Sequence, residues 1–526
     1  MALNETEVKQ TRQEKRSICA RRLTVSHFQV DALEHDALQV LSLLQSTRNT
    51  FALVNRIPPE ILTLIPDYWT DGERERSLVR LTHVCRGWRE IFISCPSLWA
   101  RLDCKRAHKT RVYIERSKSS PLEICLGQVD DEFCQEEAFL LAVPHIGRLK
   151  ALSVSGSLTP ILPVLVEHFS RAFPLLETLK IGLDPTTTEL PNTLFNGDLS
   201  SLRELSLTGG LIPQSWRGLS NLTTFNLHHV PGVDTLLTQL LDFFESTPHL
   251  RHIQLHHLIP DTDDAPIERV TSLPCLKKLS IIAQPVHSIL LNHLTVPAGA
   301  SLRLEFSFDG AESPVPFYLP KSLDSLCNLS YITAVALCFG SERRFMRLHG
   351  PSGELYVLGN WISGRDQPYA GTNRFLRSLS QFDISRTRRL AITLCRSQPP
   401  DTAPVVTWAI YRILRSMKNL HTFTLVRCKN LPFILALNPK TSPSGIILCP
   451  ELEEIILHIG HSGRLNVDEL LSMLKERASR GAKLSTITIV GTDVLTPKEV
   501  KRLKKHVSCV KYKFDGVPPE WDTLPS

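Results

Sequence analysis

Apolar residues recur from residue 149 onward in a six-residue pattern, Leu-x-x-Leu-x-Leu. Clean copies begin at Leu149, Leu176, Leu202, Leu222, Leu250 and Leu276, and three later copies begin at Leu420, Leu452 and Leu484. The first six starts are 27, 26, 20, 28 and 26 residues apart, and the last three are 32 apart. Alternating apolar and polar positions within each copy predict a strand with one buried face. The steady spacing predicts one structural unit that repeats along the chain.

The intervals between these strands carry apolar residues at helical spacing, for example in residues 234–244 and 467–475. Alternating strands and helices predict a parallel sheet. The pattern resembles that of leucine-rich repeats, whose period is about 20–29 residues. We therefore expect an α/β fold: an irregular leucine-rich-repeat-like horseshoe with parallel strands over residues 149–515, and a tail over 516–526. Irregularity is expected because the asparagine that usually follows the strand is missing.

Residues 285–415 fit the repeat worst. We expect variant copies there, beginning at Leu302 and Ile332, and a long loop around Gly350–Gly371. Residues 104–148, which precede the first clean copy, are interpreted as a connecting segment.

The pattern near the N-terminus is helical. Residues 1–26 are mainly polar and are interpreted as a flexible arm. Residues 31–48 carry apolar side chains at three- and four-residue spacing, namely Leu33, Ala37, Leu38, Leu41 and Leu44. We therefore predict a helix within residues 27–56 that packs on the segment after it.

The segment Ile57–Asp103 is predicted to form three short helices. Pro58, Pro59 and Glu60 suit a helix start, because the missing proline N–H would be unpaired there anyway and a carboxylate favours the positive helix end. Pro66 is expected to end this helix early. A unit of about 45 residues is marginal by itself. Its leftover apolar face is therefore interpreted as a partner-binding surface.

Three groups of residues in this segment resemble the F-box. They are Pro59-Glu60-Ile61-Leu62, Val84-Cys85-Arg86-Gly87-Trp88 and Leu98-Trp99, which occur in the order and spacing of that family. The segment looks most like the F-box family expanded in mushroom-forming fungi, in which a long divergent repeat region follows the box. This likeness extends through Thr110–Ile124. The chain departs from the family at Ile57, where leucine is usual, and at Pro66, where a large apolar residue often stands.

The resemblance implies a substrate-recognition adaptor of an SCF ubiquitin ligase. In that family the box binds a Skp-type adaptor on a cullin scaffold, and the C-terminal repeats select a target protein. No catalytic residue and no cofactor are implied. The residues expected to face the Skp-type adaptor are Ile57, Pro58, Ile61, Leu62, Ile65, Leu78, Leu81, Val84, Cys85 and Trp88. Trp88 has a second interpretation, as a residue of the domain's own core, and Cys85 is expected on an apolar helix face that disfavours a thiolate.

The residues that flank the strand leucines are expected to point to the concave face of the horseshoe. The candidate target-binding residues are Thr224, Asn226, His228, His252, Gln254 and His256. Their hydrogen-bonding groups suit a protein partner and could make its binding pH-sensitive; a merely solvated strand face is the alternative. A metal site is disfavoured, since His252 and His256 would lie about 13 Å apart on a strand.

Composition changes this picture little. The net charge is +7, from 60 basic and 53 acidic side chains, and the local basic clusters are modest, so nucleic acid is a weak third candidate partner. Thirteen irregularly spaced cysteines, including Cys338 and Cys395 in apolar runs, suggest free buried thiols and a reducing compartment, cytoplasm or nucleus. No membrane-length apolar run and no motif of the common enzyme classes is present. A non-catalytic repeat scaffold without a ubiquitination role remains the alternative function.

Overall fold

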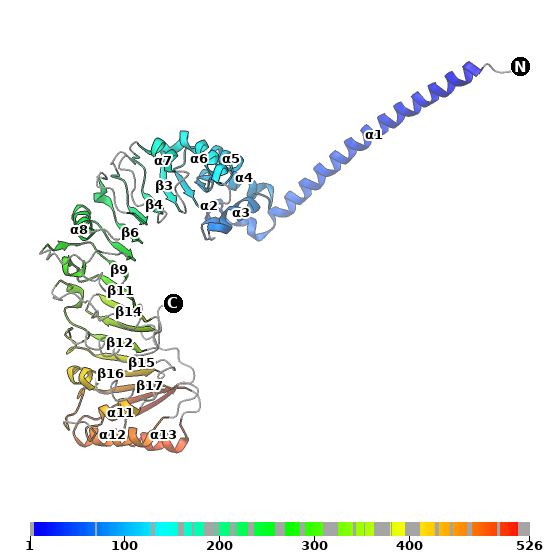
Figure 1. Ribbon diagram of the computed structural model, residues 1–526. Coiled ribbons are helices and arrows are strands. Elements are labelled where there is room, and N and C mark those ends of the chain that lie inside the picture. The colour runs from blue at the N-terminus through cyan, green and yellow to red at the C-terminus, as the bar shows by residue number, and fades with distance from the viewer. Residues whose placement is uncertain are drawn as a thin grey trace. The chain divides into compact units, whose positions relative to one another are not determined.

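The computed structural model describes 22 ranges of the chain and divides it into two compact units. The described residues are 5–68, 71–127, 132–155, 162–170, 173–182, 195, 199–210, 216, 218–229, 236–257, 269–283, 290–308, 325–339, 343–351, 353–361, 379, 381–394, 411–426, 431–441, 445–459, 465–491 and 495–513. The first unit holds Met1–Cys125 and Asp131–Leu149, and the second holds Leu126–Asp130 and Lys150–Ser526. Each unit is described by itself below (Figure 1).

The first unit begins with one long helix, α1 (Glu5–Thr50). It starts well before residue 31 and covers most of the segment that was expected to be a flexible arm. Its large apolar side chains Leu33, Leu38, Leu41 and Leu44 are between 52% and 68% exposed. The Arg86 guanidinium donates a hydrogen bond to the Ser42 hydroxyl. The packing expected for this helix therefore does not include its leucines.

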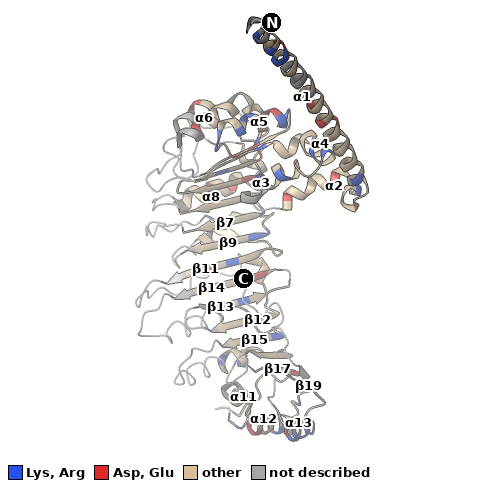
Figure 2. Ribbon diagram, turned by 90° about the vertical axis from the view of Figure 1, so that its right-hand side faces the viewer, with Lys and Arg blue, Asp and Glu red and all other residues tan. Residues whose placement is uncertain are grey.

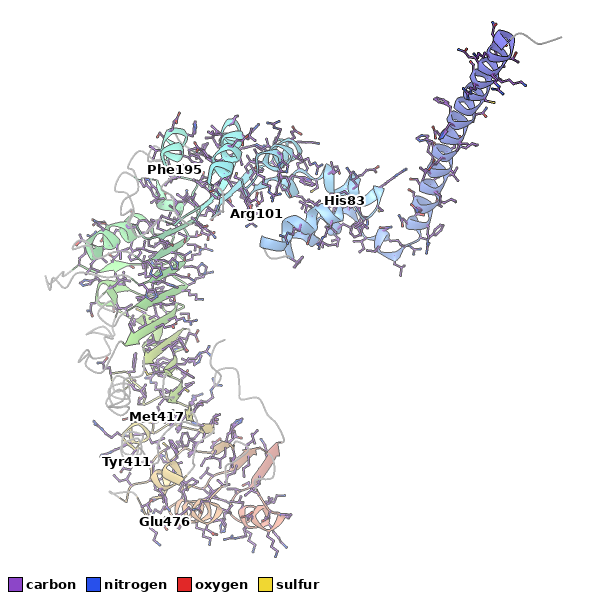
Figure 3. The ribbon with its side chains drawn as sticks, turned by 45° about the vertical axis from the view of Figure 1, so that its right-hand side comes forward. His83, Arg101, Phe195, Tyr411, Met417 and Glu476 are labelled. Carbon is purple, nitrogen blue, oxygen red and sulfur yellow. The ribbon has the colours of Figure 1, made fainter. Side chains whose placement is uncertain are left out.

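Short helices follow α1 in the segment that resembles the F-box. They are η1 (Leu53–Arg56), α2 (Pro59–Leu64), η2 (Ile65–Tyr68), α3 (Asp71–Leu81), α4 (Arg86–Ser94) and η3 (Pro96–Trp99). Helix α2 has Pro59 in its first turn and ends one residue before Ile65, so Pro66 does shorten it, as expected. His83 lies in the turn between α3 and α4 (Figure 3).

A small α/β layer completes the first unit. Strand β1 (Arg101–Leu102) pairs in parallel with β2 (Leu122–Leu126), and α5 (Ala107–Ser117) connects them. Buried Trp99 donates its indole N–H to the Phe92 carbonyl at 2.8 Å, and its ring packs edge-on against Tyr113 at 5.0 Å. The Arg116 guanidinium covers the same ring at 4.3 Å. Helix α5 therefore closes the core around Trp99.

Helix α6 (Glu132–Ala142) and η4 (Val143–Arg148) pack on this layer. The Arg148 guanidinium donates to the Ser120 carbonyl at 2.7 Å and to the Ser117 hydroxyl at 3.0 Å. Residues 104–148 are therefore more than a connection, since most of them belong to helices and strands of the first unit.

The second unit is built on parallel strands, and each clean copy of the repeated pattern contains the start of one of them. In spatial order the first seven are β3 (Leu149–Val154), β4 (Thr178–Gly182), β5 (Glu204–Thr208), β6 (Thr224–His228), β7 (His252–His256), β9 (Lys278–Ala283) and β11 (Ser301–Phe308). Four parallel strands end the sheet: β16 (Thr422–Val426), β17 (Glu454–His458), β18 (Thr486–Val490) and β19 (Cys509–Lys513). A separate parallel pair is formed by β8 (Thr271–Ser272) and β10 (Leu294–Thr295).

An antiparallel insertion interrupts this order in the region that fits the repeat worst. The insertion comprises β12 (Ala334–Phe339), β13 (Arg343–His349) and β14 (Glu354–Trp361), and it precedes β15 (Arg389–Leu394). Strand β14 pairs in parallel with β11, and β12 pairs in parallel with β15. The three strands of the insertion therefore lie in the sheet in the reverse of their order along the chain. Strand β13 lies antiparallel between β14 and β12.

A tight turn replaces much of the long loop that was expected around Gly350–Gly371. The Gly350 N–H donates to the Gly353 carbonyl at 2.9 Å. A Cβ on Gly350 would lie 2.1 Å from the Asn328 carbonyl oxygen, and one on Gly353 would lie 2.4 Å from the Ala300 carbonyl oxygen. Only glycine fits at both positions. Strand β14 then continues to Trp361, and residues 362–371 lie outside the described residues.

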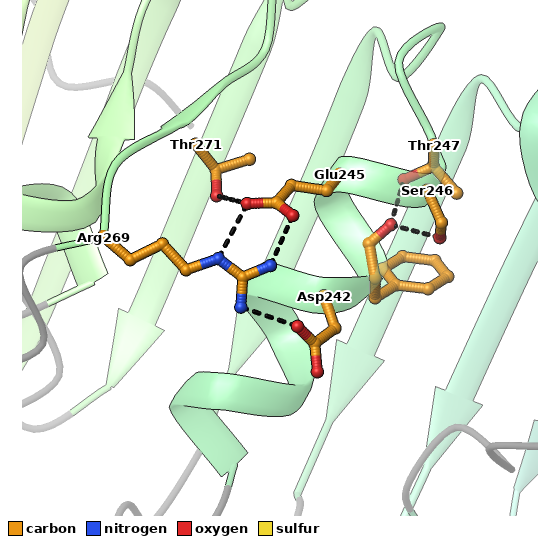
Figure 4. Close-up of polar contacts among 7 residues, drawn as sticks. Asp242, Glu245, Ser246, Thr247, Arg269 and Thr271 are labelled. Carbon is orange, nitrogen blue, oxygen red and sulfur yellow. Dashed lines mark hydrogen bonds and ion pairs between the residues drawn. The ribbon is translucent and has the colours of Figure 1, made fainter.

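Helices and 3-10 turns fill the intervals between strands. They are α7 (Leu162–Phe169), η6 (Leu219–Asn221), α8 (Leu236–Ser246), η8 (Cys327–Leu329), α11 (Leu431–Leu437), α12 (Val467–Ser479) and α13 (Pro497–Leu503). Helices α8 and α12 are the two that the sequence predicts most clearly. Arg269 ties α8 to the chain before β8, because its guanidinium binds both Glu245 and Asp242 (Figure 4).

Candidate partner-binding surfaces

Three of the ten residues expected to face the Skp-type adaptor lie in the core of the helical segment. Leu62, Leu78 and Trp88 are buried. The Trp88 indole N–H donates to the Asn55 side-chain oxygen at 2.6 Å, and the ring packs against Phe92 at 5.9 Å. Of the two interpretations of Trp88, the structure supports the core role. These three side chains hold the helices together and cannot themselves form an exposed contact surface.

The remaining apolar side chains of this segment form an exposed surface. Ile61 on α2 is 53% exposed, and Val84 in the turn before α4 is 57% exposed. Pro58 is exposed, while Ile57, Ile65, Leu81 and Cys85 are partly buried. Leu64, Tyr68 and Val79 are exposed as well and were not among the predicted contact residues. Leu64 follows Ile61 by three residues, which was the available signal, since residues three apart lie on one helix face.

Cys85 has a different position from the one expected. It is the N-cap of α4, in an extended conformation, and its sulfur accepts a hydrogen bond from the Trp88 backbone N–H at 3.5 Å. The residue therefore shapes the helix start instead of lying on a helix face. The same hydrogen bond links Cys85 to Trp88, whose ring is buried.

A comparison with known families decides what this helical segment is. Residues 54–105 match the family model described as F-box-like. The chain therefore carries an F-box-like domain. The match agrees with the segment Ile57–Asp103 identified from the sequence, and it ends before the α5 helix that covers Trp99. No curated protein matches the chain.

The second candidate surface is the polar face of the sheet, opposite the buried leucines. We use "polar sheet face" for the side chains that alternate with the buried ones on β4, β5, β6, β7 and β9, as in the pattern of β5 and β6. The structure places Thr224 opposite His252, Asn226 opposite Gln254, and His228 opposite His256. All six predicted target-binding residues therefore lie on two adjacent strands and on one face. The Asn226 side-chain oxygen is buried and, among the described residues, has no hydrogen-bond partner.

Histidines gather at one end of this face. The rings of His228 and His256 lie 4.3 Å apart, centroid to centroid. Directly after the strands, His229 and His257 stack at 4.7 Å. This second pair was not predicted, although Leu-His-His occurs in both repeats, at 227–229 and 255–257. His252 lies at the opposite end of β7 and does not join the cluster.

The second histidine pair occupies an unusual backbone conformation. His229 and His257 have φ values of 51° and 49°. Gly209, which has the same place after the preceding strand β5, has φ 83°. This left-handed region suits glycine and is sparsely used by other residues, although histidine is enriched among the exceptions. Two adjacent repeats thus place a side chain where glycine would be less strained.

Burial and mutual repulsion disfavour the charged form of the inner histidines. Burial lowers the pKa of His256 to about 4, and the nearby His228 and His257 rings add to this effect, while Glu305 opposes it. The pKa of His228 is also lowered, first by burial and then by His229 and His257. Both rings are therefore neutral near pH 7, when each presents one donor and one acceptor nitrogen. A surface of this kind forms directional hydrogen bonds with little net charge.

The part of the chain that the structure describes was also compared with the requirements of metal sites, membrane spans and nucleic-acid surfaces. Within it, no three His, Cys, Asp or Glu side chains are placed to hold a metal ion. None of the described helices combines the length and apolarity that crossing a bilayer requires. Cys338 is buried, as expected, whereas Cys395 lies outside the described residues. Figure 2 shows single charged positions on β9 to β13, without a continuous basic stripe in that view.

Proposed function

We propose that this protein is the substrate-recognition adaptor of an SCF-type ubiquitin ligase. The F-box-like domain binds a Skp-type adaptor, which connects the chain to a cullin scaffold. The strand repeats bind the target protein on the polar sheet face. The observation that carries the proposal is the exposed apolar surface of a domain that matches the F-box family model. The protein itself contributes binding surfaces and positions the target, while partner subunits perform the ubiquitin transfer.

The exposed surface has the chemistry that a permanent protein partner requires. Ile61, Leu64 and Val84 each leave about half of their side chain in water. Fully burying such a side chain stabilises a complex by roughly 1.5–3 kcal/mol, so burying the exposed half gives about 1 kcal/mol or slightly more. Several such anchors together offset much of the loss of freedom on association. The buried core of Leu62, Leu78 and Trp88 holds these anchors in a fixed arrangement.

Capture of a Skp-type adaptor by the full-length protein tests the proposal. Ile61→Asp combined with Val84→Asp places two charges in the middle of the contact, so we expect binding to weaken by at least about 100-fold. Val112→Asp is the matched control, because Val112 is an exposed apolar residue on α5, outside the matched residues 54–105. Far-ultraviolet circular dichroism of each variant verifies that the helices remain.

Two results would contradict the proposal. The wild-type protein could fail to capture any Skp-type adaptor, which would leave the alternative of a repeat scaffold without a ubiquitination role. Alternatively, the double variant could bind as tightly as the wild type, which would move the contact away from Ile61 and Val84.

The target-binding part of the proposal rests on the polar sheet face. Alanine at His228, His252 and His256 tests it, one residue at a time, in affinity capture from cells treated with a proteasome inhibitor. We expect His228→Ala and His256→Ala to reduce the same captured proteins, since the two rings are in contact. His252→Ala is expected to have the weaker effect because His252 lies apart from the pair. Unchanged capture by all three variants would refute this site.

A further inference from the structure

A polar hollow opens at the edge of the sheet where strands β4 to β7 begin. Its volume is about 430 Å³. The side chains that matter most for its chemistry are Glu177, Arg203, Thr223, His249 and Arg251. All of them except His249 lie directly before a strand, so most of the hollow is built from equivalent positions of successive repeats. It is distinct from the histidine cluster, which lies at the opposite end of the same strands.

Two arginines flank the middle of this hollow. The Thr223 N–H donates to the Arg203 carbonyl at 2.9 Å, and the Arg251 N–H donates to the Thr223 carbonyl at 2.8 Å. Thr223 therefore separates the two arginines by one strand on each side, which places their backbones about 10 Å apart. Both side chains line the same hollow and are long enough to reach a group bound between them.

Within the part of the chain that the structure describes, both guanidinium groups are available to a ligand. Among the described residues, Arg203 and Arg251 have no side-chain hydrogen bond or ion pair, and both residues are exposed. By contrast, the Arg269 guanidinium binds two carboxylates, and that of Arg347 binds Glu354 at 2.9 Å. An arginine presents five donors in a planar fork, and two unengaged forks that border one hollow are suited to an oxygen-rich ligand.

Among the described residues that line the hollow, the charge is positive once the ion pair between Lys150 and Glu177 is counted. Glu177 is the acidic residue that lines it, and its carboxylate lies 3.5 Å from the ammonium of Lys150. Lys277 continues the row of strand-start residues, because its N–H donates to the Arg251 carbonyl at 2.8 Å. Arg203, Arg251 and Lys277 therefore leave an uncompensated positive charge beside a group of hydroxyl and amide side chains.

We propose that this hollow binds an oxyanion carried by the target protein, either a phosphate ester or a carboxylate. Arg203 and Arg251 hold the oxyanion from two sides by charge-assisted hydrogen bonds, which are shorter and stronger than neutral ones. The inference rests on the proposed function, since it names the chemistry that the repeats recognise in a target. A peptide is the carrier because the hollow is compact and its two arginines suffice for one oxyanion, whereas a nucleic acid requires basic contacts to many successive phosphates.

Peptide binding to the full-length protein tests this proposal. The probes are three degenerate peptide pools that differ only at a central residue, which is phosphoserine, glutamate or serine. We expect the phosphoserine pool or the glutamate pool to bind at least tenfold more tightly than the serine pool, with affinity falling as salt is added. Inorganic phosphate is expected to compete with the phosphoserine pool. The better of the two anionic pools identifies the source of the oxyanion.

Variants of the two arginines connect that binding to the hollow. Arg203→Gln and Arg251→Gln are each expected to weaken binding of the anionic pool by about tenfold. Arg203→Lys is expected to recover part of the loss, because it restores the charge but not the planar fork. Arg388→Gln is the matched control, since Arg388 is an exposed arginine just before β15 and does not line the hollow. Both arginines in the hollow are exposed, so the variants are expected to keep the melting temperature of the wild type.

Each remaining outcome decides against the inference. Equal binding of all three pools would overturn it, and so would an Arg203→Gln/Arg251→Gln double variant that binds like the wild type. Binding of a uridine homopolymer that the double variant loses, without binding of any peptide pool, would replace the peptide by an RNA. Capture of the Skp-type adaptor is measured on the same samples, so that a failure of the adaptor role is distinguished from a failure of the hollow.

Discussion

The two candidate binding surfaces of this protein have opposite chemistry. The F-box-like domain exposes aliphatic side chains such as Ile61 and Val84 above a small buried core. The polar sheet face exposes amides, hydroxyls and imidazoles above a continuous row of buried leucines. The first surface gains free energy from apolar burial, which depends little on the details of the partner. The second depends on directional hydrogen bonds, which penalise a partner whose groups do not match.

This difference suits the two tasks in the proposed function. A common adaptor subunit needs a stable contact that is the same in every complex, and apolar anchors supply it. A target must be distinguished from other proteins, and unmatched buried polar groups supply that discrimination. We therefore expect that a substitution that weakens binding at one surface leaves binding at the other surface unchanged.

The largest effect is expected for Trp88→Ala. It removes a buried indole together with its hydrogen bond to Asn55 and its contact with Phe92, which costs about 3–5 kcal/mol. A domain of this size is marginally stable, so we expect the F-box-like domain to unfold and adaptor capture to disappear. Limited proteolysis should cut within residues 54–105 while fragments of the repeats persist.

The comparison partner for this variant is Ile61→Ala. It removes an exposed aliphatic group, so we expect weaker adaptor binding without a change in proteolysis. If Trp88→Ala left the domain resistant to protease and reduced only the affinity, Trp88 would be a contact residue and its assignment to the core would be wrong.

A smaller effect, confined to the other unit, is expected for Arg477→Ala. Arg477 is fully buried on α12, where its guanidinium donates to the Leu448 carbonyl at 2.7 Å and to the Cys449 carbonyl at 2.8 Å. Its loss leaves two buried carbonyls without these donors, which costs about 2–4 kcal/mol. We expect a lower melting temperature for the repeats and unchanged capture of the Skp-type adaptor.

Arg477→Lys sharpens this prediction, since lysine can satisfy one of the two carbonyls and should restore part of the stability. A loss of adaptor capture in Arg477→Ala, with the F-box-like domain still folded, would show that the two regions are energetically coupled and would contradict the separation.

Regular periodicity explains which parts of the fold were predictable from the sequence. Each clean copy of the repeat carries enough buried apolar residues to fix both the strand and its exposed face, so β3 to β7, β9 and β16 to β18 each begin within a predicted copy. The reversed spatial order of β12, β13 and β14 could not be predicted, because alternating apolar residues indicate a strand but not which strands pair with it. That arrangement depends on a turn in which Gly350 and Gly353 approach two backbone carbonyls.

The candidate sites show the same limit at the level of single residues. The motif around Trp88 identified the domain but could not separate core from contact, because both roles favour large apolar side chains. Exposure separates them: Trp88 is buried, whereas Ile61 and Val84 are not. The hollow between Arg203 and Arg251 was not predicted, because these residues are 48 positions apart in sequence and border one hollow only through strand register.

The smallest effect we predict is a dependence of the repeat unit's stability on pH. Burial and neighbouring rings hold the pKa of His256 at about 4, below its ordinary value near 6.5, so the unfolded chain binds a proton more readily than the folded one. Stability is therefore full above about pH 6.5 and falls as the pH is lowered toward 4. His256→Gln removes this proton uptake, so its melting temperature should change less between pH 7 and pH 4.5 than that of the wild type, whereas His252→Gln should behave like the wild type. If the melting temperatures of the wild type and of His256→Gln changed equally over this interval, the folded protein would not disfavour protonation of His256. The polar sheet face would then differ from the F-box-like surface only in its hydrogen bonds.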